Sequence, residues 1–287
     1  MIKVNGYPIE IKKFPNGESL IKRNFVYKGD IIKAFNISLK FESNDDLMHL
    51  AMIKHEIDEV GGIADLQLPY VPYSRMDRTE GENVFTLKTI CKFINSLNFK
   101  QVYILEPHSD VCVALLDRVV SHEYTTGRLL PKVISDNNLY YENDYLVFPD
   151  SGAEKRYAKR VEYKNILTAI KHRDFTTGEI KSLEVIGKAK EGFNAIIVDD
   201  LCSKGGTFML TANKLKEMGA NKIYLAVTHC ESTILDGDVL KYDSPIEKVY
   251  TTNSIINESY LRLAKPQFEL CFGKKVDINK LYVESVF

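Results

Sequence analysis

Apolar and polar positions follow two rhythms along this chain, and both halves show them. Short apolar runs at 64–71 and 101–106 are typical of buried strands, and residues 85–97 between them carry apolar side chains at helical spacing. The second half repeats this rhythm, with strands expected at 145–148, 165–170, 194–200, 222–229 and 247–252 and helices expected at 152–161 and 208–218. Strands that alternate with helices of about 10–15 residues are typical of parallel sheets. We therefore expect an α/β protein of two similar domains, each a mostly parallel sheet with helices on both faces.

Two polar features divide this pattern. Asn16 and Gly17 lie between two segments of alternating apolar and polar residues, which predicts a β-hairpin near the N-terminus. The stretch 130–144 is rich in Asp and Asn and separates the two halves. We therefore expect an N-terminal domain at 1–137 and a C-terminal domain at 138–287, with the last residues packing back on the N-terminal domain.

Composition excludes several classes of partner. The chain has 38 Lys and Arg residues against 39 Asp and Glu residues, for a net charge of −1, so no global positive field favours a nucleic-acid partner. No apolar run approaches the roughly 18 residues that span a membrane, and the N-terminus lacks a signal-peptide core. Five cysteines are scattered without paired spacing, which argues for reduced thiols. We expect no membrane partner and a cytoplasmic location.

The most informative stretch is 196–207, where an apolar run ends in Asp199 and Asp200 and is soon followed by Gly205, Gly206 and Thr207. A strand that ends this way presents both carboxylates at the carboxyl edge of a parallel sheet, where such sheets bind ligands. The glycine N–H groups and the start of the next helix can hold an anion. Carboxylates beside an anion-binding turn suit a sugar phosphate whose diol the acids bind. An ordinary tight turn is the alternative interpretation.

Polar residues follow four other predicted strands in the same way. They are the segment 69–78, His108, Asp150 and the pair Lys171 and Arg173. Each of them alone is usual for a loop, but five polar strand ends indicate a shared site. Lys171 and Arg173 lie two positions apart, so on extended backbone both side chains can reach the same place.

Taken in this order, the motifs resemble those of the ribose-phosphate diphosphokinases, the phosphoribosyl pyrophosphate synthetases. The segment 69–78, with Arg75, Asp77 and Arg78, distinguishes this family, whereas the acid pair with Gly-Gly-Thr is shared with phosphoribosyltransferases. The resemblance covers most of the chain and implies two phosphoribosyltransferase-type domains in a homodimer or larger homo-oligomer. It also implies transfer of the β,γ-diphosphoryl group of ATP to the anomeric hydroxyl of ribose 5-phosphate, with release of AMP, in nucleotide biosynthesis.

The resemblance further implies a role for each matching residue. Lys171 and Arg173 match catalytic residues, and His108 and Asp150 match ligands of Mg²⁺, which bridges the ATP phosphates. The positions implied for ATP binding are Phe14, Asn16, Glu18, Arg75, Met76, Asp77 and Arg78. The positions implied for ribose-phosphate binding are Asp199, Asp200, Ser203, Lys204, Gly205, Gly206 and Thr207.

This chain departs from the family pattern at three places. Ser203 and Lys204 stand where the family has Asp and Thr, so the turn loses a negative charge and gains a positive one. A substituted acceptor such as ADP-ribose, an intermediate of NAD metabolism, would suit this change, and a Lys204 that points to solvent is the alternative. Met76 replaces Gln near adenine, which leaves the nucleotide selectivity open. After His229 the family's phosphate-binding turn is missing, which argues against allosteric phosphate or ADP control.

Two functions of other classes fit the same residues less fully. A phosphoribosyltransferase needs only one such domain, and the doubled pattern argues against it. A non-catalytic regulatory homologue would not need Lys171, Arg173, His108 and Asp150, all of which are retained.

Overall fold

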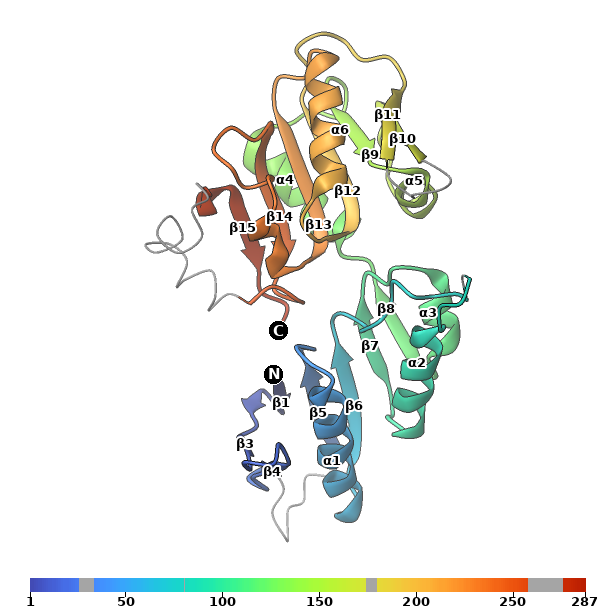
Figure 1. The fold of residues 1–287 in the computed structure, drawn as a ribbon, viewed down its shortest axis with the longest axis vertical. Coiled ribbons are helices and arrows are strands. Elements are labelled where there is room, and N and C mark those ends of the chain that lie inside the picture. The colour runs from blue at the N-terminus through green and yellow to red at the C-terminus, as the bar shows by residue number, and fades with distance from the viewer. Residues whose placement is uncertain (26–33, 80, 174–179, 258–275) are drawn as a thin grey trace. The chain divides into compact units, whose positions relative to one another are not determined.

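The computed structural model describes residues 1–25, 34–79, 81–173, 180–257 and 276–287, and describes no side chains between 172 and 182 (Figure 1). The chain divides into two compact units. Unit 1 contains Met1–His122 together with Phe287, and unit 2 contains Glu123–Val286. Residues 123–137, which the sequence prediction assigns to the N-terminal domain, group with unit 2. The reason is that Leu130 and Val133 are buried in the same core cluster as Tyr250.

Unit 1 is built on a six-stranded sheet with the order β2-β1-β5-β6-β7-β8. The strands from β5 to β8 run parallel, and β1 pairs antiparallel with both β2 and β5. The bounds are β1 Ile2–Val4, β2 Tyr7–Pro8, β5 Ala34–Leu39, β6 Ile63–Leu68, β7 Val102–Leu105 and β8 Val119–His122. A separate hairpin of β3 (Ile11–Lys13) and β4 (Ser19–Ile21) confirms the turn predicted at Asn16 and Gly17.

The three described helices of unit 1 pack into one core on one face of this sheet. They are α1 (Asp45–Glu59), α2 (Thr86–Ser96) and α3 (Asp110–Leu115), and each contributes buried side chains to the same cluster as the strands. Many strand positions between the core positions are polar, such as Ser38 on β5, which donates a hydrogen bond to Gln67 on β6 (3.0 Å). Successive side chains of a strand point to opposite faces of the sheet, so the alternating apolar side chains of these strands lie on its one buried face.

Unit 2 is built on a seven-stranded sheet with the order β11-β10-β9-β12-β13-β14-β15, in which only β10 and β11 pair antiparallel. The bounds are β9 Tyr145–Phe148, β10 Ile166–Arg173, β11 Ile180–Ile186, β12 Ala195–Cys202, β13 Ile223–Cys230, β14 Ile246–Thr252 and β15 Leu281–Glu284. All eight residues of β13 are buried. A continuous apolar run is the signature of a parallel strand covered on both faces.

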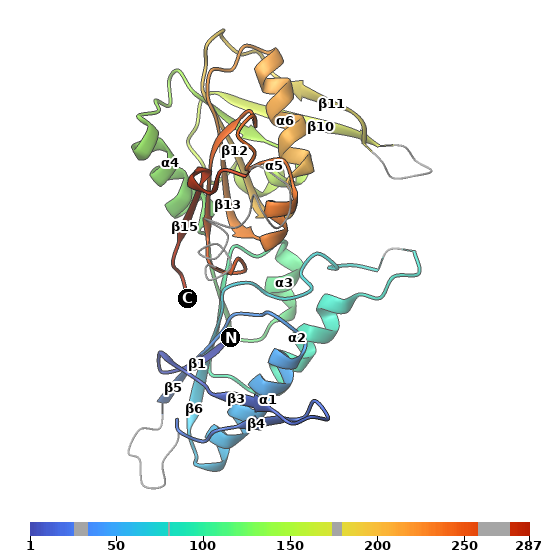
Figure 2. The same ribbon diagram turned by 60° about the vertical axis from the view of Figure 1, so that its left-hand side comes forward.

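Helices cover both faces of this second sheet (Figure 2). The turn η1 (Thr125–Leu129) and helices α4 (Leu130–Asn137) and α5 (Ser151–Tyr157) pack on one face. Helix α6 (Gly206–Glu217) and the turn η2 (Ser232–Asp236) pack on the other, and the turn η3 (Ile278–Lys280) precedes β15. The fold is thus α/β with two sheet-based units, as the alternating pattern predicts, but among the described residues helices cover both faces only in unit 2.

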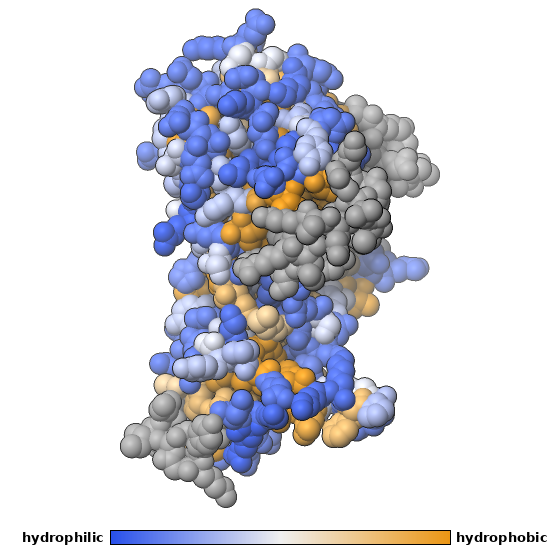
Figure 3. Space-filling model, turned by 90° about the vertical axis from the view of Figure 1, so that its left-hand side faces the viewer, coloured by the Kyte–Doolittle hydropathy of each residue, from blue (hydrophilic) through white to orange (hydrophobic). Residues whose placement is uncertain are grey.

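No helix among the described residues is both long and apolar enough to cross a lipid bilayer. The face drawn in Figure 3 is largely hydrophilic where it is described, with apolar side chains gathered in smaller areas.

Candidate functional site

Three neighbouring strands of unit 2 bring the predicted acids and Lys171 to one sheet edge. Strand β9 lies between β10 and β12, and its Val147 pairs with Leu167 on one side and Ile197 on the other. The strands run parallel, so the residues that follow these positions lie toward the same edge of the sheet. Lys171, Asp199 and Asp200 lie in the carboxyl-terminal halves of the paired strands, and Asp150 follows the end of β9. This edge is where open parallel sheets bind ligands.

Asp150 is fixed by the helix that it begins. It is the N-cap of α5, and its Oδ1 accepts a hydrogen bond from the Ala153 N–H (2.9 Å), while its Oδ2 accepts one from Lys171 Nζ (2.8 Å). Burial acts to raise the pKa of Asp150, but the hydrogen bonds from Lys171 and the backbone, with the charge of Lys171, outweigh it and leave the pKa below its ordinary value. The pair is therefore ionic, and it holds the Lys171 ammonium at the strand edge.

The acid pair has a cationic partner that the sequence prediction omits. Arg156 on α5 donates from Nη1 to Asp200 Oδ1 (2.5 Å), and the same nitrogen lies 3.4 Å from Asp199 Oδ1. Burial acts to lower the pKa of Arg156, but the nearby Asp200 and other groups raise it above its ordinary value. In the sequence, nothing distinguishes Arg156 from the neighbouring charges of this helix. Only the fold turns it toward the sheet edge.

The two acids are not equivalent. The side chain of Asp200 is 5% exposed and lies closest to Arg156, whereas that of Asp199 is 16% exposed. Burial raises the pKa of Asp199 well above its ordinary value, the carboxylates of Asp200 and Asp150 add to this, and Arg156 opposes it. Asp199 Oδ1 also accepts a hydrogen bond from the Asp200 N–H (2.9 Å). Asp199 is thus the acid better placed to meet a ligand, and Asp200 is the acid that Arg156 holds.

Residues 203–207, which we call the anion loop, comprise the turn after β12 and the first two residues of α6. Gly205 has φ +82°, and a Cβ there would lie 2.2 Å from Val239, so this position needs glycine for both its conformation and its packing. Helix α6 begins at Gly206 and is twelve residues long. The backbone N–H groups of its first turn have no partners within the helix and lie at the loop. The N-terminus of a helix after such a turn favours negative charge.

A second segment lies against the anion loop. Ser203 Oγ donates a hydrogen bond to Glu231 Oε2 (2.6 Å), and Thr233 Oγ1 donates to the same oxygen (3.0 Å). Glu231 follows β13, the neighbour of β12, and its own N–H donates to the Cys202 carbonyl (2.8 Å). The sequence prediction does not include Glu231. Glu231 directly follows a buried apolar run, and this pattern could have identified it as a candidate site residue.

The residues predicted for ATP binding belong to unit 1. Phe14, Asn16 and Glu18 form the hairpin turn, where the Phe14 N–H donates to the Glu18 carbonyl (2.8 Å) and the Phe14 side chain is 50% exposed. Arg75 and Arg78 are exposed, and Met76 and Asp77 between them are half-buried.

His108 also belongs to unit 1 and is half-buried, just before α3. The loop that holds Arg75 follows β6, and His108 follows β7. Because β6 and β7 are parallel neighbours, both segments leave the sheet at the same edge.

Arg173 ends β10. Its side chain lies outside the described residues.

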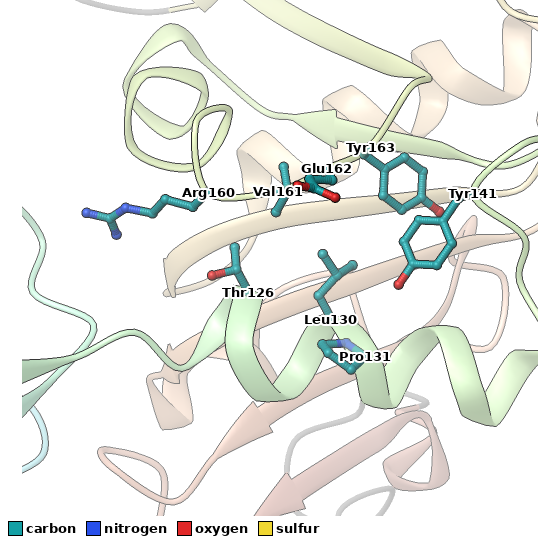
Figure 4. Close-up of a pocket in the computed structure, with 8 residues that line it drawn as sticks. All are labelled: Thr126, Leu130, Pro131, Tyr141, Arg160, Val161, Glu162 and Tyr163. Carbon is teal, nitrogen blue, oxygen red and sulfur yellow. The ribbon is translucent and has the colours of Figure 1, made fainter.

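Unit 2 also has a cavity of about 400 Å³ between α4 and the segment after α5 (Figure 4). The rings of Tyr141 and Tyr163 lie side by side at one end, with centroids 4.9 Å apart, and Arg160 extends away at the other end. None of the predicted site residues lines this cavity.

The donor set suits magnesium better than a transition metal. No three described His, Cys, Asp or Glu residues are grouped closely enough to hold an ion among themselves. Mg²⁺ is usually bound through one or two carboxylates together with substrate phosphates and water. Asp150 supplies one such carboxylate, so it fits a metal that arrives with ATP.

Comparisons with known proteins show which proteins the chain is similar to. Residues 151–287 match the family model described as a phosphoribosyl synthetase-associated domain. The chain is 26% identical to the ribose-phosphate pyrophosphokinase of Pyrococcus furiosus over 260 residues, which cover 86% of each chain. It is 28% identical to that of Sulfurisphaera tokodaii over 262 residues, which cover 89% of this chain and 87% of that protein.

A solved structure shows the same fold over nearly the whole chain. The phosphoribosylpyrophosphate synthetase of Mycobacterium smegmatis matches with a TM-score of 0.70 and 21% identity, covering 97% of this chain and 86% of that one. The family model, the relatives and the motifs at the sheet edges point to one group of proteins, the ribose-phosphate pyrophosphokinases, to which the chain is similar over most of its length.

Proposed function

We propose that this protein is an ATP-dependent diphosphotransferase that makes phosphoribosyl pyrophosphate and AMP from ATP and ribose 5-phosphate. The anomeric C1 hydroxyl attacks the β-phosphorus of ATP, the bond from that phosphorus to the α,β-bridging oxygen breaks, and the hydroxyl proton passes to solvent. The observation that carries the proposal is the gathering of Asp150, Lys171 and the acid pair at one edge of the unit 2 sheet. The names of the relatives support the same reaction.

The sugar would bind at β12. The anion loop would take the 5-phosphate with its N–H groups, and Asp199 would accept hydrogen bonds from the ribose diol. Arg156 keeps two adjacent carboxylates compatible, because its guanidinium lies within 3.4 Å of an oxygen of each. A ribose bound in this way would present its anomeric hydroxyl to the diphosphoryl donor.

Lys171 and Arg173 would stabilise the negative charge of the transferring group, because preorganised cations at such a position lower the barrier to phosphoryl transfer. Mg²⁺ would neutralise phosphate charge; Asp150 would be its ligand from unit 2, and His108 is the ligand proposed from unit 1. The hairpin residues Phe14, Asn16 and Glu18, together with the segment 75–78, would bind the nucleotide. We further propose a cytoplasmic homodimer or larger homo-oligomer.

The product of ATP tests the reaction class. The protein should release AMP when it is incubated with ATP, Mg²⁺ and ribose 5-phosphate, and should release none without the sugar. ADP as the product would instead indicate ordinary kinase chemistry. Release of pyrophosphate from phosphoribosyl pyrophosphate and a base would indicate a phosphoribosyltransferase. If no turnover is seen while ATP still binds, a non-catalytic regulatory homologue is the better description.

ADP-ribose is a second candidate acceptor, suggested by the positive charge that Lys204 adds to the anion loop; the exposure of Lys204 is equally what the alternative, a lysine that points to solvent, requires. A lysine at this position can pair with the second phosphate of a diphosphate ester. Comparing AMP release with ribose 5-phosphate and with ADP-ribose distinguishes the two acceptors, and a clear preference for the simple sugar phosphate would remove ADP-ribose.

Asp199→Asn should weaken the sugar site and leave the nucleotide site alone. The amide has one acceptor oxygen where the carboxylate has two, and hydrogen bonds to charged groups contribute about 1.5–3 kcal/mol, so the KM for the acceptor should rise roughly 10- to 150-fold. Steady-state kinetics with each substrate varied in turn measure this change. A variant with an altered KM for ATP alone would contradict the placement of the diol.

A further inference from the structure

One wall of the anion loop is formed by residues 231–239, which we call the loop wall. The backbone of Gly237 lies so close to Lys204 that a Cβ there would be 1.9 Å from the Lys204 carbonyl oxygen. Val239 packs on Gly205, and the Glu231 N–H donates to the Cys202 carbonyl. The segment after β12 and the loop wall are therefore packed together at Cys202, Lys204 and Gly205.

The loop wall presents a carboxylate to a site that should hold an anion. Glu231 Oε2 accepts a hydrogen bond from Ser203 Oγ at 2.6 Å. A carboxylate therefore contacts the side chain of the first residue of the anion loop. Thr233 donates to the same oxygen and helps to fix the position of the carboxylate. Glu231 and Ser203 are both half-buried, so water screens this charge less than it would on an open surface.

We propose that Glu231 is a specificity-determining residue that sets the charge of the acceptor's 5-substituent. This inference rests on the proposed function, because it assumes that the anion loop holds the acceptor. A free 5-phosphate carries close to two negative charges at neutral pH, whereas each phosphate of a diester carries one. The carboxylate therefore repels a terminal phosphate more strongly than an esterified one, and it lowers the preference of the loop for the simple sugar phosphate.

Glu231→Gln separates charge from geometry. The glutamine oxygen can still accept from Ser203 and Thr233, so the loop keeps its hydrogen bonds while the charge is removed. For charges a few ångströms apart near a protein surface, we expect the KM for ribose 5-phosphate to fall about tenfold. The KM for ADP-ribose should fall less, and the KM for ATP should not change.

Two further variants control the experiment. Glu217→Gln changes the net charge equally at an exposed position at the far end of α6, and it should alter neither acceptor. Glu231→Ala removes both the charge and the hydrogen bonds, so its loop should be less ordered and its KM for both acceptors higher than that of Glu231→Gln. Raising the salt concentration should shrink the difference between the wild type and Glu231→Gln.

The proposal is overturned if Glu231→Gln leaves the KM for ribose 5-phosphate unchanged or raises it, or if both acceptors change by the same factor. Calorimetric binding of ribose 5-phosphate to the wild type and to Glu231→Gln gives an answer that does not depend on turnover. If the wild type releases no AMP, the proposed reaction fails, yet tighter binding to the variant still supports the role of Glu231. If neither protein binds ribose 5-phosphate, this inference fails as well.

Discussion

Lys171→Ala should leave ATP binding nearly intact while kcat falls by about 10²–10⁴, the range expected when one preorganised stabilising charge is lost from a transition state. The Lys171 side chain is only 13% exposed, and its ammonium is held 2.8 Å from Asp150 Oδ2. The charge therefore occupies a fixed position before any ligand arrives. AMP release measures kcat, and calorimetry with ATP measures binding.

The same variant should fold normally. Without Lys171, Asp150 keeps the hydrogen bond from the Ala153 N–H and a side chain that is 36% exposed, so it is not left as a buried unpaired charge. Lys155→Ala, at an exposed position on α5, is the matched control and should turn over at the wild-type rate. A Lys171→Ala variant with unchanged kcat would exclude this lysine from the mechanism.

Arg156→Met should lower the free energy of unfolding by about 3–5 kcal/mol, because removing one partner of a buried ion pair leaves uncompensated charge behind. Here the charge left behind belongs to two adjacent acids, Asp199 and Asp200, whose side chains are 16% and 5% exposed. Methionine retains much of the apolar volume, so the loss reports mainly on charge. Urea unfolding followed by circular dichroism measures it.

Arg160→Met is the control for this prediction. Arg160 pairs with Glu123 at 3.1 Å, but both side chains are at least one-third exposed, and such pairs contribute about 0–1 kcal/mol. The double variant with Asp200→Asn should recover part of the stability that Arg156→Met loses. If Arg156→Met and Arg160→Met cost the same, the ion pair at the acid edge does not have the strength that its burial implies.

Much of the fold follows from local pattern. The apolar runs and helical spacings predict strands β6, β7, β9, β10, β12, β13 and β14 and helices α2, α5 and α6 near their observed places. The polar stretch at 130–144 is misleading, because it contains the helix α4, which buries Leu130 and Val133 in unit 2. A polar helix surface and a linker look alike in sequence, since only the partner surface decides which side chains become buried.

The residues of the candidate site also fall into those that the sequence predicts and those that it does not. Asp150, Lys171, Asp199 and Asp200 are predictable because each lies at or near the carboxyl end of an apolar run, and the order of strands then brings them to one edge. Arg156 and Glu231 were missed because their partners are distant in sequence. Arg156 pairs with an acid 44 residues away, and Glu231 with a serine 28 residues away. Pairings of this kind depend on tertiary structure, and no periodicity of the chain records them.

Position 237 offers a simple criterion for variants of this chain. Because a Cβ on residue 237 would fall 1.9 Å from the carbonyl oxygen of Lys204, any residue other than glycine must push the main chain around Lys204 away. A natural variant that lacks this glycine would be unable to keep the turn after β12 in its present shape, even with all of residues 203–207 unchanged. The identity of residue 237 would thus indicate, before any assay, whether a variant keeps the loop that we propose as the sugar-phosphate site in its present shape.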